Sequence, residues 1–494
     1  MRCSGILLPI SSLPSPYGIG TLGAAAFRFV DFLQAAGQHF WQILPVGQTG
    51  YGDSPYQSVS SFAANPYFID LDLLAEQGLL RVGEIAACPW GVSETRIDYS
   101  LLYKNRYPLL HLAVSRLDPD SADFLAFKAE AEDWLEDYAL FMAIKASNQM
   151  SPMRNWLKPL RLRDEQALQA AREELAAEIV FWEQVQFLFY RQWTALKVYA
   201  RQKNIRIIGD IPIYVSPDSA DLWLNPSLFQ TDEDLNLLEV AGCPPDAFSP
   251  DGQLWGNPLY NWPRHLETDF SWWIRRLRHA GQVYDVLRID HFRGIESYFS
   301  IPGHHGTAAG GCWCPGPGRK FIAAIQQALP DLPIIAEDLG FVTPEVKQLL
   351  AESGYPGMKV LQFAFDSREG GDYLPFNYQH NSVVYTGTHD NTTTEDWQHS
   401  APAEDVRFAR DFLDAYNSED FTWRFIRMAL ATVADTCIIP LQDYLRLGAE
   451  ARINTPSTKT NNWQWRVDKA MLTTELTGKI RHLTSLYGRL VTIK

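Results

Sequence analysis

The chain has 494 residues, 46% of them hydrophobic, which is enough for two or three average domains or for one large barrel with insertions. Its formal net charge of −15 and pI of about 5.2 argue against nucleic acid or an anionic membrane surface as the main partner. A neutral small molecule or polymer fits this charge better. Most of the 16 Trp and 21 Tyr are expected in the core, but exposed aromatic faces are what sugar rings stack on.

The six cysteines are scattered and lack the paired spacing of a disulfide framework or a zinc ribbon. Cys312 and Cys314 form one close pair, but a single intervening residue is the wrong spacing for a redox CxxC motif. We expect two unlinked thiols in a loop. The first apolar stretch is too short for a secretory signal, and no run of about 18 apolar residues occurs. The sequence therefore predicts a soluble, cytoplasmic protein with no membrane segment.

Short apolar runs that end in Gly, Pro or charged residues recur along the chain, at residues 5–10, 40–46, 206–215, 285–290, 333–339, 358–365, 382–390 and 436–445. Between them lie segments with helical periodicity, at residues 22–36, 321–329, 344–352 and 406–434. Apolar strands that alternate with helices favour a parallel sheet covered on both sides. Eight such units predict an α/β fold, a closed (β/α)8 TIM barrel.

Two intervals are too long for simple crossovers and are predicted to be insertions in one catalytic barrel that spans residues 1–494. Residues 71–205 have strong helical periodicity and predict a mostly helical subdomain after the second strand. Residues 216–284 are rich in Pro, Gly, Asp and Trp and predict a loop-rich subdomain after the third strand. Loops that follow barrel strands lie on the carboxyl-terminal face, where barrel enzymes carry out their chemistry.

Charged and polar residues gather where the predicted strands stop. They are Asp210 after the third strand, Arg288, Asp290 and His291 after the fourth, Glu337 and Asp338 after the fifth, and His389 and Asp390 after the seventh. A single carboxylate at a strand end is more often a helix cap or a salt-bridge partner than a catalyst. Because barrel strand ends converge on one bowl, four ends with acids favour a shared site.

Three chemistries could use these residues. Divalent-metal hydrolysis would want several His and carboxylate ligands, often with a His pair on the first strand, and residues 5–10 have none. Schiff-base chemistry needs a Lys at a strand end, but Lys359 lies inside the sixth strand. Acid, base and nucleophilic work by carboxylates remains, as in the cleavage of glycosidic bonds.

Arg288 has a role within that interpretation. It precedes Asp290 by two residues along a strand, so both side chains lie on one face, where the guanidinium would keep the carboxylate ionised and oriented. The partner acid must be protonated, and a less paired, more apolar setting would raise the pKa of Glu337. Glu337 and Asp338 are adjacent, so only one can point into the bowl, and their spacing leaves both open.

Several long motifs occur in an order that resembles the 4-alpha-glucanotransferase family, also called amylomaltase or disproportionating enzyme, in the alpha-amylase clan of glycoside hydrolases. They are TGYGDSPYQSVSSFAANPYFIDL (49–71), DVLRIDHFRG (285–294), IIAEDLG (334–340), GTHDNTTT (387–394) and RINTPSTKTNNWQWR (452–466). The resemblance covers essentially the whole chain.

The resemblance implies Asp290 as nucleophile, Glu337 as acid and base, and Asp390 as the third carboxylate, which grips sugar hydroxyls. It also implies a set of substrate-binding residues: Tyr56, which stacks under the sugar; Ser54 beside it; Asp210, Arg288, His291 and His389 around the donor sugar; Asp246, Gln253 and Trp255 in a loop over the groove; Asn454 as a polar contact near the site; Tyr51 in a second glucan-binding groove; and Phe363 near the acceptor side.

The implied reaction is retaining transfer of an alpha-1,4-glucan segment, through a covalent glycosyl-aspartate, to the 4-hydroxyl of glucose or of another alpha-1,4-glucan. Retention requires the two carboxyl groups about 5–5.5 Å apart. The implied partners are such glucans and glucose, with no cofactor and no metal. An alpha-glucan hydrolase with the same acids and a non-catalytic glucan-binding barrel are the alternatives.

Some positions depart from the family pattern. Ser457 and Asn461 stand where glycine is usual, Cys312 and Cys314 replace a basic residue and a valine, and Thr392 follows His389-Asp390-Asn391 where aspartate is more common. None of these differences replaces a carboxylate. We therefore expect them to affect chain-length preference or loop dynamics rather than the reaction.

Overall fold

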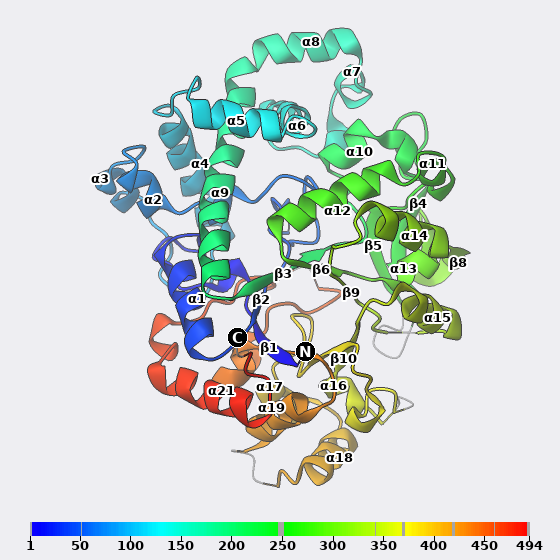
Figure 1. Ribbon diagram of the computed structural model, residues 1–494. Coiled ribbons are helices and arrows are strands. Elements are labelled where there is room, and N and C mark those ends of the chain that lie inside the picture. The colour runs from blue at the N-terminus through cyan, green and yellow to red at the C-terminus, as the bar shows by residue number, and fades with distance from the viewer. Residues whose placement is uncertain are drawn as a thin grey trace.

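The computed structural model describes residues 2–50, 52–245, 251–340, 342–367, 371–416, 420–458 and 460–491. Its centre is a closed barrel of eight parallel strands, hydrogen-bonded in the order β1-β12-β11-β10-β9-β6-β3-β2, which confirms the predicted TIM barrel (Figure 1). The strands are β1 (Cys3–Leu7), β2 (Phe40–Gln42), β3 (Arg206–Ile211), β6 (Val286–Ile289), β9 (Ile334–Ala336), β10 (Gly357–Val360), β11 (Ser382–Tyr385) and β12 (Thr436–Pro440).

All eight predicted strands are present, but several predicted ranges were too long at the carboxyl end. Proline lacks the N–H that a sheet ladder needs, and β3 stops before Pro212 while β12 ends on Pro440. β10 and β12 pass directly into the short helices α16 (Leu361–Ala364) and α20 (Leu441–Leu445). Apolar composition alone does not distinguish a buried strand from the buried helical turn that follows it.

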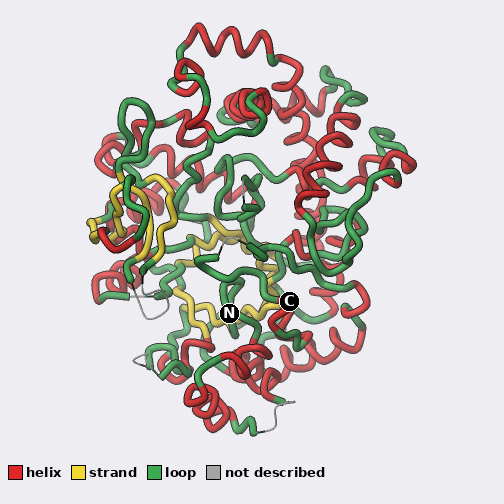
Figure 2. Tube along the Cα trace, turned by 180° about the vertical axis from the view of Figure 1, so that it is seen from behind, coloured by secondary structure: helices red, strands yellow, loops and turns green. Residues whose placement is uncertain are grey.

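Helices surround the barrel, as Figure 2 shows with helices in red around the yellow strands. The longer ones outside residues 71–205 are α1 (Ala24–Ala35), α12 (Ser271–Val283), α14 (Gly318–Ala328), α15 (Pro344–Ser353), α18 (Ala403–Leu413), α19 (Phe421–Ala431) and α21 (Thr474–Leu486). The single helical segment predicted over residues 406–434 is wrong. The chain leaves α18 through Asp414, whose φ of +52° is left-handed, and helix resumes at α19.

Residues 71–205 are mostly helical and lie above the barrel in Figure 1. Their helices are α2 (Leu71–Glu76), α3 (Val82–Ala86), α4 (Tyr99–Val114), α5 (Ala122–Glu130), α6 (Leu135–Ser147), α7 (Lys158–Arg161), α8 (Glu165–Glu174) and α9 (Ala176–Gln202). The long α9 packs against α4, α5 and α6 and also against α1 and β3. The helix α9 therefore packs on both the inserted helices and the barrel. The boundary of the subdomain at residues 71–205 stays a prediction.

Residues 216–284 contain more regular structure than the predicted loops. They hold α10 (Ala220–Leu224), β4 (Glu239–Cys243), β5 (Gln253–Pro258), α11 (Trp262–Glu267) and α12. β4 and β5 join β7 (Ser297–Pro302) and β8 (Cys312–Pro315) in a small antiparallel sheet of order β5-β4-β7-β8, beside α13 (Arg293–Glu296). Cys312 and Cys314 lie on β8 rather than in a loop. Their Sγ atoms are 4.0 Å apart and form no disulfide.

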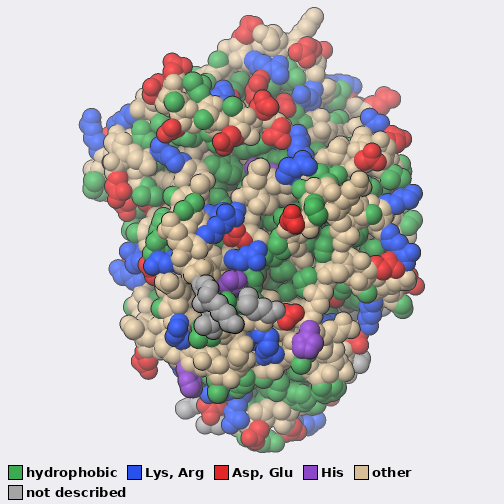
Figure 3. Space-filling model, viewed as in Figure 1, with side chains coloured by type: hydrophobic (Ala, Val, Ile, Leu, Met, Phe, Trp, Pro, Cys, Tyr) green, Lys and Arg blue, Asp and Glu red, His purple; other side chains and the backbone are tan. Residues whose placement is uncertain are grey.

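The surface fits a neutral ligand better than a polyanion. On the face in Figure 3, Lys and Arg side chains are interspersed with Asp and Glu and form no continuous basic patch. Among the described residues, no helix is both long enough and apolar enough to span a bilayer.

Candidate active site

Barrel register places the first two charged residues of the site side by side. Asp210 on β3 is the direct neighbour of Arg288 on β6, so their side chains point to the same side of the wall. Gly209, just before Asp210, allows this close packing, because a Cβ atom there would lie 2.1 Å from the ring of Tyr284. The strand ends of β3 and β6 therefore form one charged floor.

Arg288 is the buried cation of this floor. Its Nη1 lies 2.6 Å from Asp210 Oδ2 and 3.1 Å from Asp290 Oδ1, and its side chain is only 4% exposed. Burial opposes its charge, but the two carboxylates outweigh burial and raise the pKa of Arg288 further. The predicted pairing of Arg288 with Asp290 is present, and Asp210 shares the same guanidinium.

Asp290 and Glu337 follow the neighbouring strands β6 and β9 at the same level. Ile289 pairs with Ala336, and the next residues are these two acids. Burial raises the pKa of Asp290, and the Arg288 guanidinium acts in the opposite direction. Burial also raises the pKa of Glu337, against the opposing effects of Arg288 and of the His291 N–H, which donates to Glu337 Oε2 at 2.5 Å. A buried pair with a single adjacent cation favours one ionised and one protonated carboxyl group.

Asp338, the neighbour of Glu337, turns into the barrel wall. Its Oδ1 accepts a hydrogen bond of 2.6 Å from the backbone N–H of Met358 on β10, and its carboxylate packs against Gly357. Glu337 instead interacts with Arg288 and Asp390. The choice that residue spacing left open is thus made by packing, with Glu337 directed toward the other acids.

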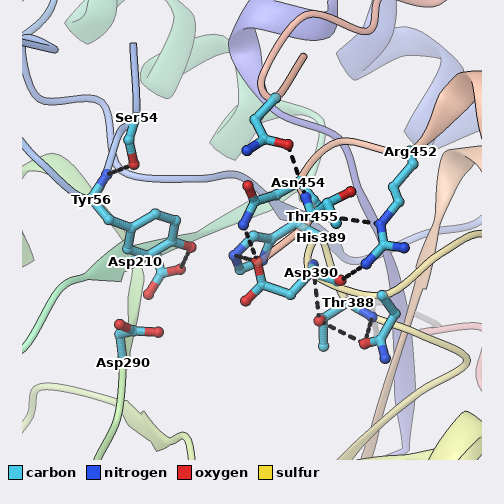
Figure 4. Close-up of polar contacts among 12 residues, drawn as sticks. Ser54, Tyr56, Asp210, Asp290, Thr388, His389, Asp390, Arg452, Asn454 and Thr455 are labelled. Atoms are coloured by element: carbon cyan, nitrogen blue, oxygen red, sulfur yellow. Dashed lines mark hydrogen bonds and ion pairs between the residues drawn. The ribbon is translucent and has the colours of Figure 1, made fainter. Parts of the chain in front are cut away.

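Asp390 lies in a loop of residues 386–393 after β11, and this loop is held by a second segment, residues 452–454 (Figure 4). Asn454 donates from Nδ2 to Asp390 Oδ1 at 2.6 Å and from its backbone N–H to His389 O at 3.1 Å. Arg452 donates from Nη2 to Asp390 O at 2.8 Å. Asn454 was expected as a substrate contact, and its amide nitrogen donates to Asp390.

Tyr56 closes one side of the bowl. Its hydroxyl donates to Asp210 Oδ2 at 2.7 Å, and its backbone N–H donates to Ser54 Oγ at 3.3 Å, so Ser54 shapes the turn that carries the ring (Figure 4). The ring stacks on His389 at 5.2 Å between centroids and lies 5.8 Å from Trp463. Burial lowers the pKa of His389, which favours a neutral imidazole in this stack.

The small sheet delivers two more predicted residues to the site. Trp255 on β5 meets the ring of His291 edge-on at 4.9 Å and donates from Nε1 to Gln253 Oε1 at 3.0 Å. Burial lowers the pKa of His291 to about 4, so its ring is neutral near pH 7. Phe363 on α16 is half-buried and packs on Tyr373 at 5.5 Å.

Two predicted residues, Tyr51 and Asp246, lie outside the described residues. Reasoning from residues and motifs did not single out Arg452 or Trp463, although both fall within the motif RINTPSTKTNNWQWR. No strand-end pattern marks them, because they reach the bowl from a loop after the last barrel strand. A cation and an aromatic ring beside Asn454 were the only available signal.

The arrangement suits acid, base and nucleophilic chemistry by carboxyl groups. Among the described residues, no group of three or more His, Cys, Asp or Glu side chains is placed to hold a metal ion. The site instead combines four acids, one shared guanidinium and aromatic walls, which is a set that binds and cleaves sugars.

Comparison with known proteins agrees with this chemistry. Residues 8–473 match the sequence model of a protein family described as 4-alpha-glucanotransferase. A 4-alpha-glucanotransferase of Clostridium butyricum is 46% identical over 97% of this chain and 99% of its own length. One from Arabidopsis thaliana, named as chloroplastic or amyloplastic, is 40% identical over 99% of this chain and 86% of its own. The structure of amylomaltase from Streptococcus agalactiae in complex with acarbose has a TM-score of 0.96 and 42% identity, over 99% of this chain and all of that one.

Proposed function

The chain belongs to the 4-alpha-glucanotransferase family, and we propose that Asp290, Glu337 and Asp390 carry out its reaction. The enzyme transfers a segment of an alpha-1,4-glucan to the 4-hydroxyl of glucose or of another alpha-1,4-glucan. The observation that carries the residue assignment is the barrel register, which sets Asp290 beside Glu337 while Arg288 contacts Asp290 at 3.1 Å.

In the first step a carboxylate oxygen of Asp290 attacks the anomeric carbon of the donor. The bond from that carbon to the glycosidic oxygen breaks, and Glu337 gives its proton to this oxygen, so that the leaving chain departs with a free 4-hydroxyl. The product is a glycosyl ester on Asp290. Burial raises the pKa of Glu337, which favours the protonated form that this step needs.

In the second step the 4-hydroxyl of an acceptor attacks the same carbon. Glu337, now ionised, takes the hydroxyl proton, and the ester bond to Asp290 breaks and restores its carboxylate. Two inversions leave the linkage alpha. Asp390 holds the sugar hydroxyls during both steps. No step needs a metal or an organic cofactor.

The substrate-binding residues belong to the same proposal. They are Tyr56, Ser54, Asp210, Arg288, His291 and His389 around the donor sugar, Gln253, Trp255 and Phe363 at the rim, and Tyr51 and Asp246. The polar contacts among Tyr56, Asp210 and Arg288 support a rigid donor site. We also propose a cytoplasmic location, which is favoured because none of the six described cysteines forms a disulfide.

The deciding experiment is incubation with pure maltotriose. Transfer yields glucose together with a ladder of longer maltodextrins, and the number of reducing ends stays nearly constant. Glucose and maltose alone, with new reducing ends for every bond cut, would indicate the alternative, a hydrolase. Full turnover by an Asp290→Ala variant would refute the assignment of the nucleophile and would revive the idea of a glucan-binding barrel.

The nucleophile can also be identified directly. A 5-fluoro-alpha-glucosyl fluoride donor slows both steps but has a good leaving group, so the glycosyl ester should accumulate. Peptide mass spectrometry is then expected to find the added sugar on the peptide that contains Asp290. A sugar on any other carboxylate would overturn the assignment.

A further inference from the structure

We propose that Arg452 and Asn454 are positioning residues that hold Asp390 in its reactive orientation; this inference rests on the role proposed for Asp390. Neither residue needs to touch the substrate for this. Both act from a segment that follows β12 and α20 in the sequence.

Three hydrogen bonds join the two segments, and a fourth links Arg452 to Asn454 within its own segment. Asn454 donates from Nδ2 to Asp390 Oδ1 at 2.6 Å and from its backbone N–H to His389 O at 3.1 Å. Arg452 donates from Nη2 to Asp390 O at 2.8 Å and from Nε to Asn454 O at 2.8 Å. The arginine therefore fixes the backbone of Asp390 and the asparagine at once, and the asparagine fixes the carboxylate (Figure 4).

Asp390 needs such support more than the other two acids do. Asp290 and Glu337 immediately follow barrel strands, whose ladders fix their backbones. Asp390 lies five residues beyond the last paired residue of β11, Tyr385, and its side chain is 44% exposed. An exposed carboxylate on a loop samples several rotamers unless a partner selects one. Asn454 engages Oδ1, and we assign Oδ2 to the sugar hydroxyls.

A double-mutant cycle separates positioning from direct substrate contact. A hydrogen bond to a charged group corresponds to about a 10- to 100-fold effect, so Asn454→Ala should lower kcat/KM on maltotriose by about that factor, mostly through kcat. Asp390→Ala should lower it more. If Asn454 acts through Asp390, adding Asn454→Ala to Asp390→Ala costs nothing further. Additive losses would mean that Asn454 binds the substrate itself and would overturn the proposal.

Arg452→Met offers a second, independent cycle with the same logic. It should also lower kcat more than it changes KM, and the loss should disappear in an Asp390→Ala background. Thermal unfolding of each variant shows whether it is folded. Asn381→Ala and Arg481→Met are matched controls, because both side chains are exposed and donate only to backbone carbonyls away from the site.

Asn454→Asp gives a pH signature that a merely structural residue would not produce. It places two carboxyl groups 2.6 Å apart in the present geometry, so one must be protonated for the pair to hold together. The protonated new carboxyl then donates to Asp390 as the amide did. Activity relative to wild type is expected to be low near pH 7 and to recover as the pH falls.

The other charged groups around Asp390 are His389, Arg452, Asp290 and Glu337, and they are common to variant and wild type. The ratio of the two pH profiles therefore isolates the new pair. A flat ratio would contradict the proposal. Failure of the proposed function is a separate outcome, because then wild-type protein itself would form no ladder from maltotriose.

Discussion

Replacing Arg288 by methionine removes a buried cation that contacts both Asp210 and Asp290. A guanidinium at hydrogen-bond distance lowers the pKa of a carboxyl group by about 1–3 units. The Arg288 contacts are 2.6 Å to Asp210 and 3.1 Å to Asp290. In Arg288→Met the pKa of Asp290 should rise by about that amount, and the nucleophile is then protonated over more of the pH range.

The activity consequence follows from the protonation state. The acidic limb of the kcat/KM profile reports the group that must be ionised, so it should move to higher pH by about 1–3 units, with at least a 10-fold loss near neutral pH. The assay is the initial rate of glucose release from maltotriose between about pH 5 and about pH 8. An acidic limb at the wild-type position would refute the idea that Arg288 keeps Asp290 ionised.

The stability consequence has a defined sign. Removing one partner of a buried ion pair lowers the free energy of unfolding by about 3–5 kcal/mol at neutral pH. In this variant Asp210 and Asp290 lose the guanidinium that they share. The pKa of Asp290 in the folded variant is then above its value in the unfolded chain. The variant should therefore recover stability as the pH falls toward the ordinary carboxyl range near 4 and lose it as the pH rises through the raised pKa of Asp290. Urea unfolding at acidic and neutral pH measures this difference.

Arg319→Met is the matched control. Arg319 pairs with Glu352 at 2.5 Å, but the two side chains are 68% and 38% exposed. Exposed pairs contribute at most about 1 kcal/mol, so this variant should keep both the wild-type pH profile and nearly all of its stability. Equal losses in the two variants would show that the Arg288 effect is not specific to the site.

Three further predictions concern residues in different roles. Glu337→Gln should lower kcat on maltotriose by about 100-fold or more. The variant should still be glycosylated by maltosyl fluoride, because fluoride leaves without a proton. Equal losses on both donors would contradict an acid role for Glu337. Asp443→Ala should lower the free energy of unfolding, measured in urea, by about 3 kcal/mol. Buried Asp443 accepts hydrogen bonds from Thr386 Oγ1 at 2.5 Å and from Thr394 N and Oγ1 at 2.8 and 2.7 Å. A loss under about 1 kcal/mol would show that these hydrogen bonds do not stabilise the fold. Trp255→Ala should raise the share of hydrolysis several-fold, because the indole covers one side of the site beside His291. This share is measured as new reducing ends per glucose released. An unchanged ratio would show that Trp255 does not shield the intermediate from water.

The barrel could be predicted because each strand is a short buried run with a helix after it. Periodicity did not find the small sheet, whose strands are brief, partly exposed and distant in sequence: Val240 on β4 pairs with Pro258 and with Ile301. Strand ends were predicted too long where a buried helical turn follows, as at β10. The break between α18 and α19 was missed because helical periodicity continues on both sides of Asp414.

The acids of the site could be predicted because strand ends in a barrel must converge. Their local partners could not. Whether Glu337 or Asp338 faces the bowl depends on the Met358 N–H, which captures Asp338. The part played by Arg452 depends on how the chain folds back after β12. Such contacts join residues far apart in the sequence, and no local pattern reports them.

The two catalytic carboxyl groups illustrate how one strand register sets two protonation states. Burial raises the pKa of both Asp290 and Glu337, so burial alone does not distinguish them. Arg288 does, because it lies on the strand that ends in Asp290 and its Nη1 is 3.1 Å from Asp290 Oδ1. Ionising Asp290 next to this cation also disfavours a second negative charge on Glu337, which strengthens the hold of Glu337 on its proton. Arg288 thus favours the ionised form of Asp290 directly, and the ionised Asp290 in turn favours the protonated form of Glu337. Arg288→Met should accordingly disturb both limbs of the pH profile, with the acidic limb moving further than the basic one.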